Sequence, residues 1–420
     1  MPNVEKLCAD GVVFDNMTAS PLCSPSRAAA LTGKYGFRTN VGNVDVELSA
    51  EETTVLDVVT TAPTPYANAV IGKWHLGGPQ ADPTQPERLG AQYFDGFLRG
   101  TVPDFFSWPR VIQGQTNTSS IYTTTALTDS AVAWTGKQTK PWLLWLAYNA
   151  PHTPFHLPPA NLLSNSTLSG AATDITQNPQ AYYMASLEAL DTELGRLLNS
   201  LPTAVRANTV VMFMGDNGTP ARVIQAPFTT ATAKGSVTEG GVHVPLIVAG
   251  AGVTEKGKRS AALLNGVDIF PTIAELARTK APGQIDGLSF AGQFTNTAAV
   301  GPRTFAYSEL FSNPATPETA TTPTATAAGA AGAGVAQRRR AAAGAGPAAG
   351  AGGVGAGGAS DTNLWAVRDT RYKLVHNVTT GAEQLFDLQT DPAEATPLPA
   401  SGSPTDIASK LKAIVTRLRG

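Results

Sequence analysis

The sequence predicts an α/β fold, a mostly parallel central sheet sandwiched by helices, followed by a small C-terminal antiparallel α+β subdomain. Apolar segments of strand length alternate with segments of helical periodicity, an order typical of parallel sheets. Several strand segments end in turns rich in glycine and polar residues, and ligands of such sheets bind at the carboxyl ends of the strands. After residue 361, short apolar segments separated by turn residues indicate the antiparallel part. The expected strands are residues 67–71, 142–148, 209–214, 245–249, 364–368, 372–376 and 384–388.

The strands at 142–148 and 209–214 are apolar throughout, so we expect both to be buried. A capping box at Ser49 and Glu52 indicates the start of one helix. The other expected helices cover residues 4–10, 126–134, 179–201, 268–278 and 407–418. The clearest is 179–201, where large apolar residues recur every three or four positions.

Composition bounds the function. A chain of 420 residues with a formal net charge of −2 has no basic field for nucleic acid, so a small-molecule partner is expected. The longest apolar run, 142–148, is far shorter than the ~20 residues of a membrane span, and the first residues lack a signal-peptide pattern. Only Cys8 and Cys23 are present, which excludes a disulfide scaffold and an all-thiolate zinc site. A Cys8–Cys23 disulfide is formally possible, but a buried structural thiol is the simpler expectation for Cys8.

Three regions are expected along the chain. Residues 1–312 form a large α/β domain, and residues 361–420 form the small C-terminal subdomain. Between them, residues 313–360 are rich in alanine, glycine and proline and contain almost no large apolar side chain. Such a composition cannot bury a core, so this insert is expected to be disordered.

The segment Pro21-Leu-Cys-Ser-Pro-Ser-Arg-Ala-Ala-Ala-Leu-Thr-Gly33 joins a turn of small residues to a helix-forming run. Cys23 therefore lies near a helix N-terminus, where anions are favoured, and Arg27 lies on the same first turn. Other polar residues fall in turns, mostly after apolar strands. Each alone reads as an ordinary surface or core residue, as we read His156 and His376, but together they indicate one site: Lys73, His75, His152, Asp216, Asn217 and Lys234.

Residues 21–33 resemble the sulfatase signature, Cys-x-Pro-Ser-Arg followed by a short spacer and Leu-Thr-Gly. The tail is similar to the C-terminal subdomain of sulfatases at Tyr372-Lys-Leu and at Leu385-Phe-Asp-Leu with Asp391-Pro392. The chain is identified by this resemblance, from about Pro2 to Leu418 outside the insert, as a type I, formylglycine-dependent, arylsulfatase-like member of the alkaline-phosphatase superfamily. The resemblance implies that a formylglycine-generating enzyme oxidises Cys23 to formylglycine, and that the substrate is a small-molecule or glycan sulfate ester.

The resemblance also implies roles. Hydrated formylglycine at position 23 would be the nucleophile, and Arg27 and Lys73 would stabilise its ionised form. His75 matches the histidine that takes a proton when the aldehyde is regenerated, and Lys234 matches a sulfate-binding lysine. His152, in Ala-Pro-His-Thr-Pro, matches a sulfate-contacting histidine and is the candidate acid for the leaving alcohol.

One bound Ca²⁺ is implied as well, with Asp216, Asn217 and the modified Cys23 as ligands, because oxygen donors suit a hard cation. From the residues alone, Gly-Asp-Asn-Gly also fits a plain turn. In the loop 234–245, Glu239 is expected to orient the loop. His243 stands where the family commonly has arginine, so a salt bridge made there would be weakened or pH-dependent.

One feature departs from the family pattern. Sulfatases ordinarily begin with a buried strand ending in two adjacent aspartates that bind the metal, and no such pair precedes Cys23, since Asp10 and Asp15 stand in a different context. A missing central strand would leave apolar sheet edges uncovered. A sulfatase, a phosphate or phosphonate ester hydrolase of the same superfamily, and an inactive pseudoenzyme or fragment therefore stay open. Full-length relatives suggest export, while this N-terminus leaves the compartment unknown.

Overall fold

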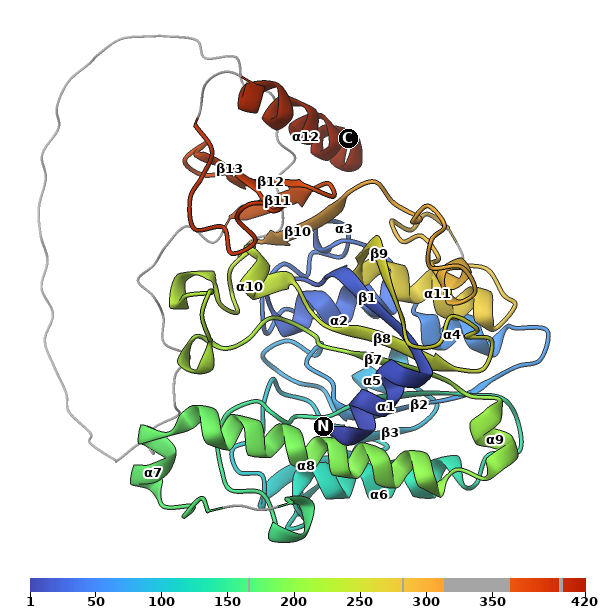
Figure 1. Cartoon of the computed structure of the whole chain (residues 1–420). Helices are drawn as coiled ribbons and strands as arrows, with labels where there is room; N and C mark the ends of the chain where they lie inside the picture. Colours follow the sequence, from blue (N-terminus) through green and yellow to red (C-terminus); the bar gives the residue numbers. More distant parts are fainter. Residues whose placement is uncertain (165–166, 282, 313–362, 400–402) are drawn as a thin grey trace, which may run out of the picture.

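The computed structural model describes residues 1–164, 167–281, 283–312, 363–399 and 403–420. The predicted insert at 313–360 lies outside these residues. The predicted α/β fold is confirmed, with helices on both faces of the sheets and a small antiparallel sheet near the C-terminus (Figure 1). In the described part of the chain, no helix is long and apolar enough to cross a membrane.

The first sheet is built around β2. Its order is β5 (Gln115–Ser119), β4 (Trp108–Ile112), β3 (Phe94–Phe97), β2 (Ala67–Lys73) and β6 (Trp142–Ala147). Strand β2 pairs in parallel with both β3 and β6, whereas β4 pairs antiparallel with β3 and β5. The turns that follow β2 and β6 therefore lie at the same edge of the sheet.

The second sheet has the order β7 (Val210–Met214), β8 (Leu246–Gly250), β1 (Gly11–Thr18) and β9 (Lys258–Asn265). Strand β8 runs antiparallel to β7 and β1, and β1 runs parallel to β9. Strand β1, which begins at the glycine that ends the first helix, is not among the strands expected from the sequence.

Strands β6 and β7 are only half-buried along almost their whole length, so the expectation that both are fully buried is wrong. The reason is pairing: each is the last strand of its sheet and bonds to a neighbour on one side only within the described residues. Their side chains still alternate between two shared apolar clusters. Leu144, Leu146 and Phe213 pack against one cluster, and Trp145 and Met212 pack against another. Side chains from the two sheets thus join the same apolar clusters, although β6 and β7 do not pair directly.

Helices cover the sheets on both sides (Figure 1). The apolar cluster around β2 and α6 includes residues of α8, and the cluster on the opposite face joins α2, α4 and α11. The capping box expected at Ser49 lies instead at Thr54, whose hydroxyl caps α4 while Asp57 bonds back to the Thr54 N–H. The helices are α1 (Pro2–Asp10), α2 (Cys23–Thr32), α3 (Gly36–Thr39), α4 (Val55–Thr60), α5 (Gln85–Arg88), α6 (Thr123–Thr135), α7 (Ala172–Gln177), α8 (Pro179–Ser200), α9 (Thr203–Ala207), α10 (Glu239–Val242), α11 (Ile269–Leu276) and α12 (Ser403–Arg419).

A third, antiparallel sheet forms the C-terminal part, with the order β10 (Ala306–Leu310), β11 (Leu364–Arg368), β12 (Tyr372–Asn377) and β13 (Glu383–Asp387). Helix α12 packs on it, so the strand and helix predictions for this region are confirmed (Figure 1). The sequence analysis does not predict β10, which joins the sheet from the other side of the insert.

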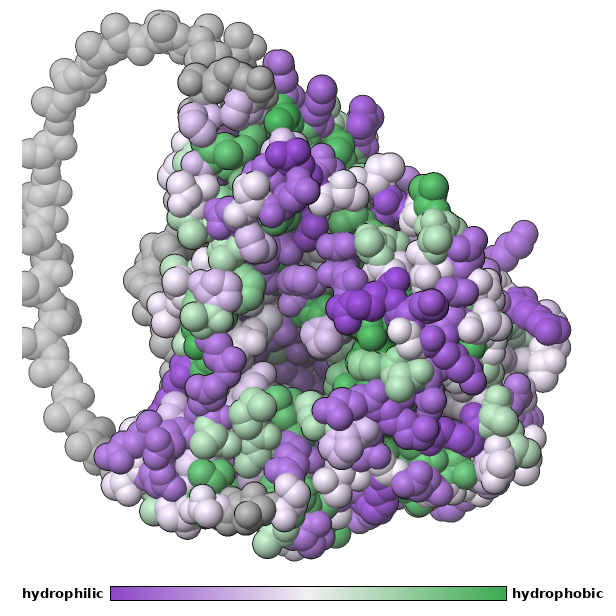
Figure 2. Space-filling model, viewed as in Figure 1, coloured by the Kyte–Doolittle hydropathy of each residue, from purple (hydrophilic) through white to green (hydrophobic). Residues whose placement is uncertain are grey.

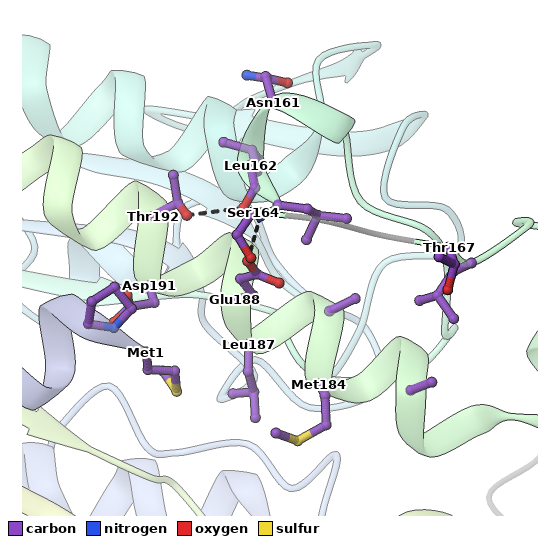
Figure 3. A pocket seen from close by; sticks show the side chains of 15 residues that line it. Met1, Asn161, Leu162, Ser164, Thr167, Met184, Leu187, Glu188, Asp191 and Thr192 are labelled. Atoms are coloured by element: carbon purple, nitrogen blue, oxygen red, sulfur yellow. Dashed lines mark hydrogen bonds between the residues drawn. The ribbon is translucent and has the colours of Figure 1, made fainter.

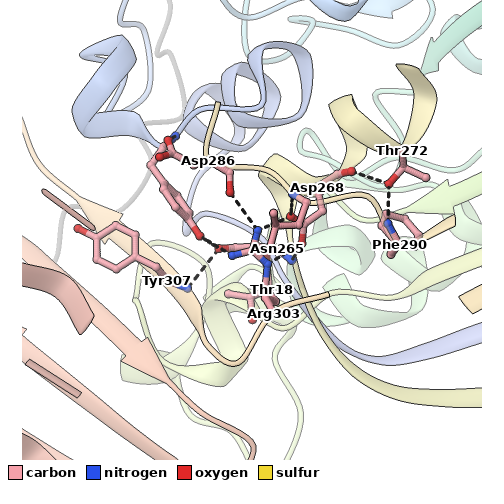
Figure 4. Close-up of polar contacts among 10 residues, drawn as sticks. Thr18, Asn265, Asp268, Thr272, Asp286, Phe290, Arg303 and Tyr307 are labelled. Atoms are coloured by element: carbon pink, nitrogen blue, oxygen red, sulfur yellow. Dashed lines mark hydrogen bonds and ion pairs between the residues drawn. The ribbon is translucent and has the colours of Figure 1, made fainter. Parts of the chain in front are cut away.

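A buried polar network holds the approach to β10 against the core (Figure 4). Arg303 donates from Nε to Asp268 at 2.8 Å and from Nη1 to the Tyr35 hydroxyl at 3.1 Å. The amide oxygen of Asn265 accepts from Tyr35 at 2.7 Å and from the Tyr307 N–H at 3.2 Å. Because every polar group of this network is paired, the network fixes the end of α2, β9 and β10 relative to one another.

Candidate active site

Helix α2 places Cys23 at its first residue. All ten residues of the helix are buried, and the helix ends at Gly33, whose left-handed backbone (φ 70°) lets its N–H bond to Ala29. At the start, the Ser26 hydroxyl donates to Leu22 O at 3.0 Å and accepts from the Ser20 N–H at 3.0 Å. The turn before the helix is thereby fixed, and Cys23 is held in place with only 2% of its surface exposed.

Two predicted site residues contact the Cys23 sulfur. The thiol donates to Asn217 Oδ1 at 3.1 Å, and the Lys234 ammonium lies 3.4 Å from Sγ. Both partners come from the segment between β7 and β8, far from α2 in sequence. Cys8 and Cys23 are free thiols, so the disulfide left open by the sequence is absent.

Arg27, one turn along α2, links the helix to the strand ends. Its Nη1 lies 3.5 Å from Asp216 Oδ2, and its Nε donates to Trp74 O at 2.9 Å. A second guanidinium nitrogen donates to Lys73 O. Burial lowers the pKa of Arg27, and Asp216 counters that effect. The guanidinium thus joins helix α2 to the end of β2 and to the turn after β7.

Lys73 ends β2, and His75 follows two residues later; both are buried. Gly72 makes this strand end possible: its φ is +113°, and a Cβ there would lie 2.0 Å from Ala147 O on β6. Burial, Lys73 and Arg27 together lower the pKa of His75 to about 2, so the imidazole is neutral at pH 7. Its Nε2 lies 3.1 Å from Asp45 Oδ1.

His152 lies in the turn after β6. Its Nδ1 lies 3.0 Å from Thr153 O, which can only accept, and 3.2 Å from the Thr153 hydroxyl, so Nδ1 carries the proton; Nε2 has no hydrogen-bond partner among the described residues. Burial, Lys73 and Lys234 lower the pKa of His152 to about 3. Asn149, in the same turn, is buried with both amide atoms unpaired among the described residues.

Asp216 and Asn217 follow β7 directly. Burial alone would raise the pKa of Asp216, but Lys73, Arg27 and Lys234 hold it at about 2. The turn packs closely on the loop that carries α10. The Gly218 N–H donates to Gly241 O at 2.9 Å, and a Cβ on Gly218 would lie 2.1 Å from the Gly240 carbonyl.

The loop from Lys234 to His243 is anchored at both ends. The Lys234 N–H donates to Thr219 O at 2.9 Å. Glu239 accepts from Lys373 Nζ and Arg368 Nη1, each at 2.9 Å, on the C-terminal sheet. His243 Nδ1 lies 3.6 Å from Glu239 Oε2, and the same carboxylate also pairs with Lys373 and Arg368.

The structure brings all the predicted site residues together, either by direct contact or within range of each other's charges: Cys23, Arg27, Lys73, His75, His152, Asp216, Asn217 and Lys234. His156 stacks on Phe105 at 4.0 Å, outside this set. The sequence analysis missed Asn149 and Asp45. Asn149 directly follows an apolar strand, a signal that could have found it, whereas Asp45 is a lone loop aspartate with no such signal.

The fit of a Ca²⁺ ion to these residues is partial. Asp216 and Asn217 supply oxygen donors of the right type beside Cys23, but Ca²⁺ takes about six to eight oxygen ligands. Within the described residues, no group of three or more histidine, cysteine, aspartate or glutamate side chains is arranged to hold a metal. Three cations, Arg27, Lys73 and Lys234, outnumber the single carboxylate. By charge, the described residues therefore suit an anion, and by number they are too few for a calcium cage.

The surface in the view of Figure 1 is hollowed near its centre (Figure 2). A separate cavity of about 830 Å³ lies along α8 near the first residues, lined in part by Met1, Met184, Glu188 and Asp191 (Figure 3). None of its lining residues belongs to the predicted site.

Comparison with known proteins decides the family. The family model described as Sulfatase matches residues 1–279. The chain belongs to the sulfatase family. Among curated sulfatases, mouse N-acetylgalactosamine-6-sulfatase is 28% identical over 329 residues, dog arylsulfatase G is 27% identical over 350, and Escherichia coli YdeN is 28% identical over 325. These matches cover 68–69% of this sulfatase and 56–61% of the relatives. The chain thus spans about 60% of the length of the curated relatives it matches.

Solved structures support the fold. Ps i-CgsB in complex with k-i-k-neocarrahexaose has a TM-score of 0.73 at 21% identity, covering 99% of this sulfatase and 86% of that chain. BT4656 in complex with its substrate D-glucosamine-2-N,6-O-disulfate has a TM-score of 0.70 at 20% identity, covering 99% and 91%. At these identities the likeness shows the fold.

Proposed function

We propose that this chain hydrolyses a sulfate ester through a formylglycine formed from Cys23 by a formylglycine-generating enzyme. The observation that carries the proposal is the position of Cys23: it is the first residue of a buried helix, 3.1 Å from Asn217 and 3.4 Å from Lys234. Membership of the sulfatase family supports the reaction class. Solved neighbours bound to a carrageenan oligosaccharide and to a sulfated glucosamine make a glycan sulfate a reasonable substrate, alongside small-molecule esters.

The cations of the site have distinct tasks. Lys234 binds the oxygens of the sulfate group, because its ammonium lies beside position 23, where the sulfur of the ester must be attacked. Arg27 and Lys73 offset the negative charge that develops there as the S–O bond to the alcohol breaks. Hydrated formylglycine would supply the attacking oxygen. Asp216 and Asn217 would contribute two of the oxygen ligands of a Ca²⁺ ion, which supplies Lewis-acid chemistry when bound.

The two histidines handle protons at opposite stages. His152 donates a proton from Nε2 to the oxygen of the departing alcohol, because Nδ1 is tied to Thr153 O. In the free site its pKa is about 3, and a bound sulfate anion, by offsetting Lys73 and Lys234, raises that pKa toward the working range. His75, neutral at pH 7, accepts the proton released when sulfate leaves and the aldehyde at position 23 re-forms.

Mass spectrometry of the Cys23 peptide tests the first step. After co-expression with a formylglycine-generating enzyme, position 23 is expected to lose its sulfur and carry an aldehyde, whereas Cys8 in the same molecule stays a thiol and serves as the control. A thiol that persists at position 23 contradicts the proposal.

The modified protein is then assayed with 4-nitrophenyl sulfate and 4-nitrophenyl phosphate in the presence of Ca²⁺, with Cys23→Ala as the inactive control. Faster turnover of the sulfate supports the proposal. Faster turnover of the phosphate favours a phosphate ester hydrolase of the same superfamily. Complete modification without turnover of either ester, together with weak Ca²⁺ binding by calorimetry, identifies an inactive member of the family.

A further inference from the structure

The side chain of Asp45 contacts the imidazole of His75. The distance from His75 Nε2 to Asp45 Oδ1 is 3.1 Å. A carboxylate only accepts hydrogen bonds, so Nε2 must donate. The imidazole is neutral in this positively charged site, so Nδ1 is left unprotonated. Nδ1 is buried and, among the described residues, has no hydrogen-bond partner.

Gly100 fixes the plane of the same ring. A Cβ on Gly100 would lie 2.5 Å from His75 Cε1 and 2.7 Å from Nε2, so the imidazole packs directly against the glycine backbone. With Gly100 on one side and Asp45 at Nε2, the ring has little freedom to rotate. The unpaired Nδ1 is therefore held in one direction.

The segment that carries Asp45 is attached to the turn that carries His75. The Leu48 N–H donates to Leu76 O at 2.9 Å. The buried amide of Gln85 donates to Leu48 O at 3.0 Å and to Leu76 O at 2.9 Å. These hydrogen bonds hold the backbone of the two segments together, so the fold keeps Asp45 next to His75, although the Asp45 side chain is 53% exposed.

We propose that Asp45 is a positioning residue that holds His75 as the Nε2–H tautomer and so keeps Nδ1 free to accept a proton in the active site. The inference deepens the proposed function and rests on it for the effect on turnover. The tautomer itself requires neither formylglycine nor substrate. The two parts can therefore fail separately.

The tautomer is tested by NMR on the unmodified protein labelled with ¹⁵N-histidine. The sequence has five histidines, and a His75→Gln variant assigns the signals of His75. We expect the Nε2–H pattern in the parent. Asp45 has a left-handed backbone (φ 56°), which asparagine and glycine both tolerate, so Asp45→Asn and Asp45→Gly keep the fold. An asparagine amide both donates and accepts, and glycine offers no partner, so both variants should show a mixture of tautomers.

Glu47→Gln is the matched control, because Glu47 is an exposed carboxylate in the same segment, and its replacement should leave the His75 signals unchanged.

In the modified enzyme, Asp45→Asn should lower kcat for 4-nitrophenyl sulfate about 10-fold while KM is unchanged. This is the smaller end of the loss of activity caused by removing the carboxylate partner of a histidine. An unchanged His75 tautomer in both Asp45 variants overturns the inference, as does the same change in Glu47→Gln. If the parent enzyme is inactive, the proposed function fails and the tautomer result still decides the role of Asp45.

Discussion

Replacing Glu239 by glutamine should destabilise the protein strongly, because this carboxylate neutralises two buried cations. Lys373 Nζ and Arg368 Nη1 each bond to Glu239 at 2.9 Å, and the side chains of Lys373 and Arg368 are 2% and 7% exposed. Glutamine keeps the shape but removes the charge, so Lys373 keeps only its ion pair with Glu394, and Arg368 loses its carboxylate partner among the described residues. Breaking a buried ion pair by removing one partner costs about 3–5 kcal/mol, and we expect a loss of that size.

Urea unfolding followed by circular dichroism and tryptophan fluorescence measures this loss. Asp10→Asn is the control, since Asp10 pairs with Lys6 in a solvent-exposed salt bridge that is worth about 0–1 kcal/mol. A loss below about 1 kcal/mol in Glu239→Gln, equal to the control, would refute the view that this network fastens the C-terminal sheet to the active-site loop.

The same residue predicts the response to acid. Although burial alone would raise it, Lys373 and Arg368 lower the pKa of Glu239 from 4.5 to about 2. A group whose folded pKa is depressed stabilises the fold above its unfolded pKa and loses that contribution as pH falls through the folded value. The parent should therefore lose stability between about pH 4.5 and pH 2, and Glu239→Gln should lack this component.

Three further outcomes are expected. Gly72→Ala should lower the free energy of unfolding by about 2–4 kcal/mol in thermal unfolding, because the φ of Gly72 is +113° and a Cβ there would collide with Ala147 O. The control Gly252→Ala, at φ +75° with open space around it, should lower it by only about 1 kcal/mol. Lys234→Ala should weaken sulfate binding at least about 10-fold in calorimetry through loss of a charge-assisted contact. His152→Gln should slow alkyl sulfates about 10²–10⁴-fold and aryl sulfates much less, because only the poorer leaving group needs the proton; equal losses for both would argue against an acid role.

Much of this architecture is local and could be predicted from the sequence. The strand ending at Lys73 and the helix at 179–200 follow from apolar periodicity, and residues 21–33 identify Cys23 because their order and spacing are specific. The predicted charged residues mostly lie in turns after strands, and they come close together in the structure because strand ends meet at one edge of a sheet.

Pairing between distant segments could not be predicted in the same way. β6 and β7 have the composition of buried strands, and their half-exposure depends on which strands lie beside them. Strand β10 is short and pairs with β11 across the insert, a partner that lies more than 50 residues further along the chain. Asp45 carries no sequence signal, because its role comes from a backbone clamp to the turn at His75.

The charges of the site link substrate binding to proton transfer. Arg27, Lys73 and Lys234 give the free site an excess of positive charge over Asp216, and burial, Lys73 and Lys234 lower the pKa of His152, which is therefore neutral. A neutral His152 cannot serve as an acid at Nε2 until an anion offsets the lysines. A sulfate ester is such an anion, whereas water and neutral alcohols are not. Under the proposed function, binding of the sulfate ester would raise the pKa of His152, so the cations proposed to bind sulfate would also restrict proton transfer to the occupied site.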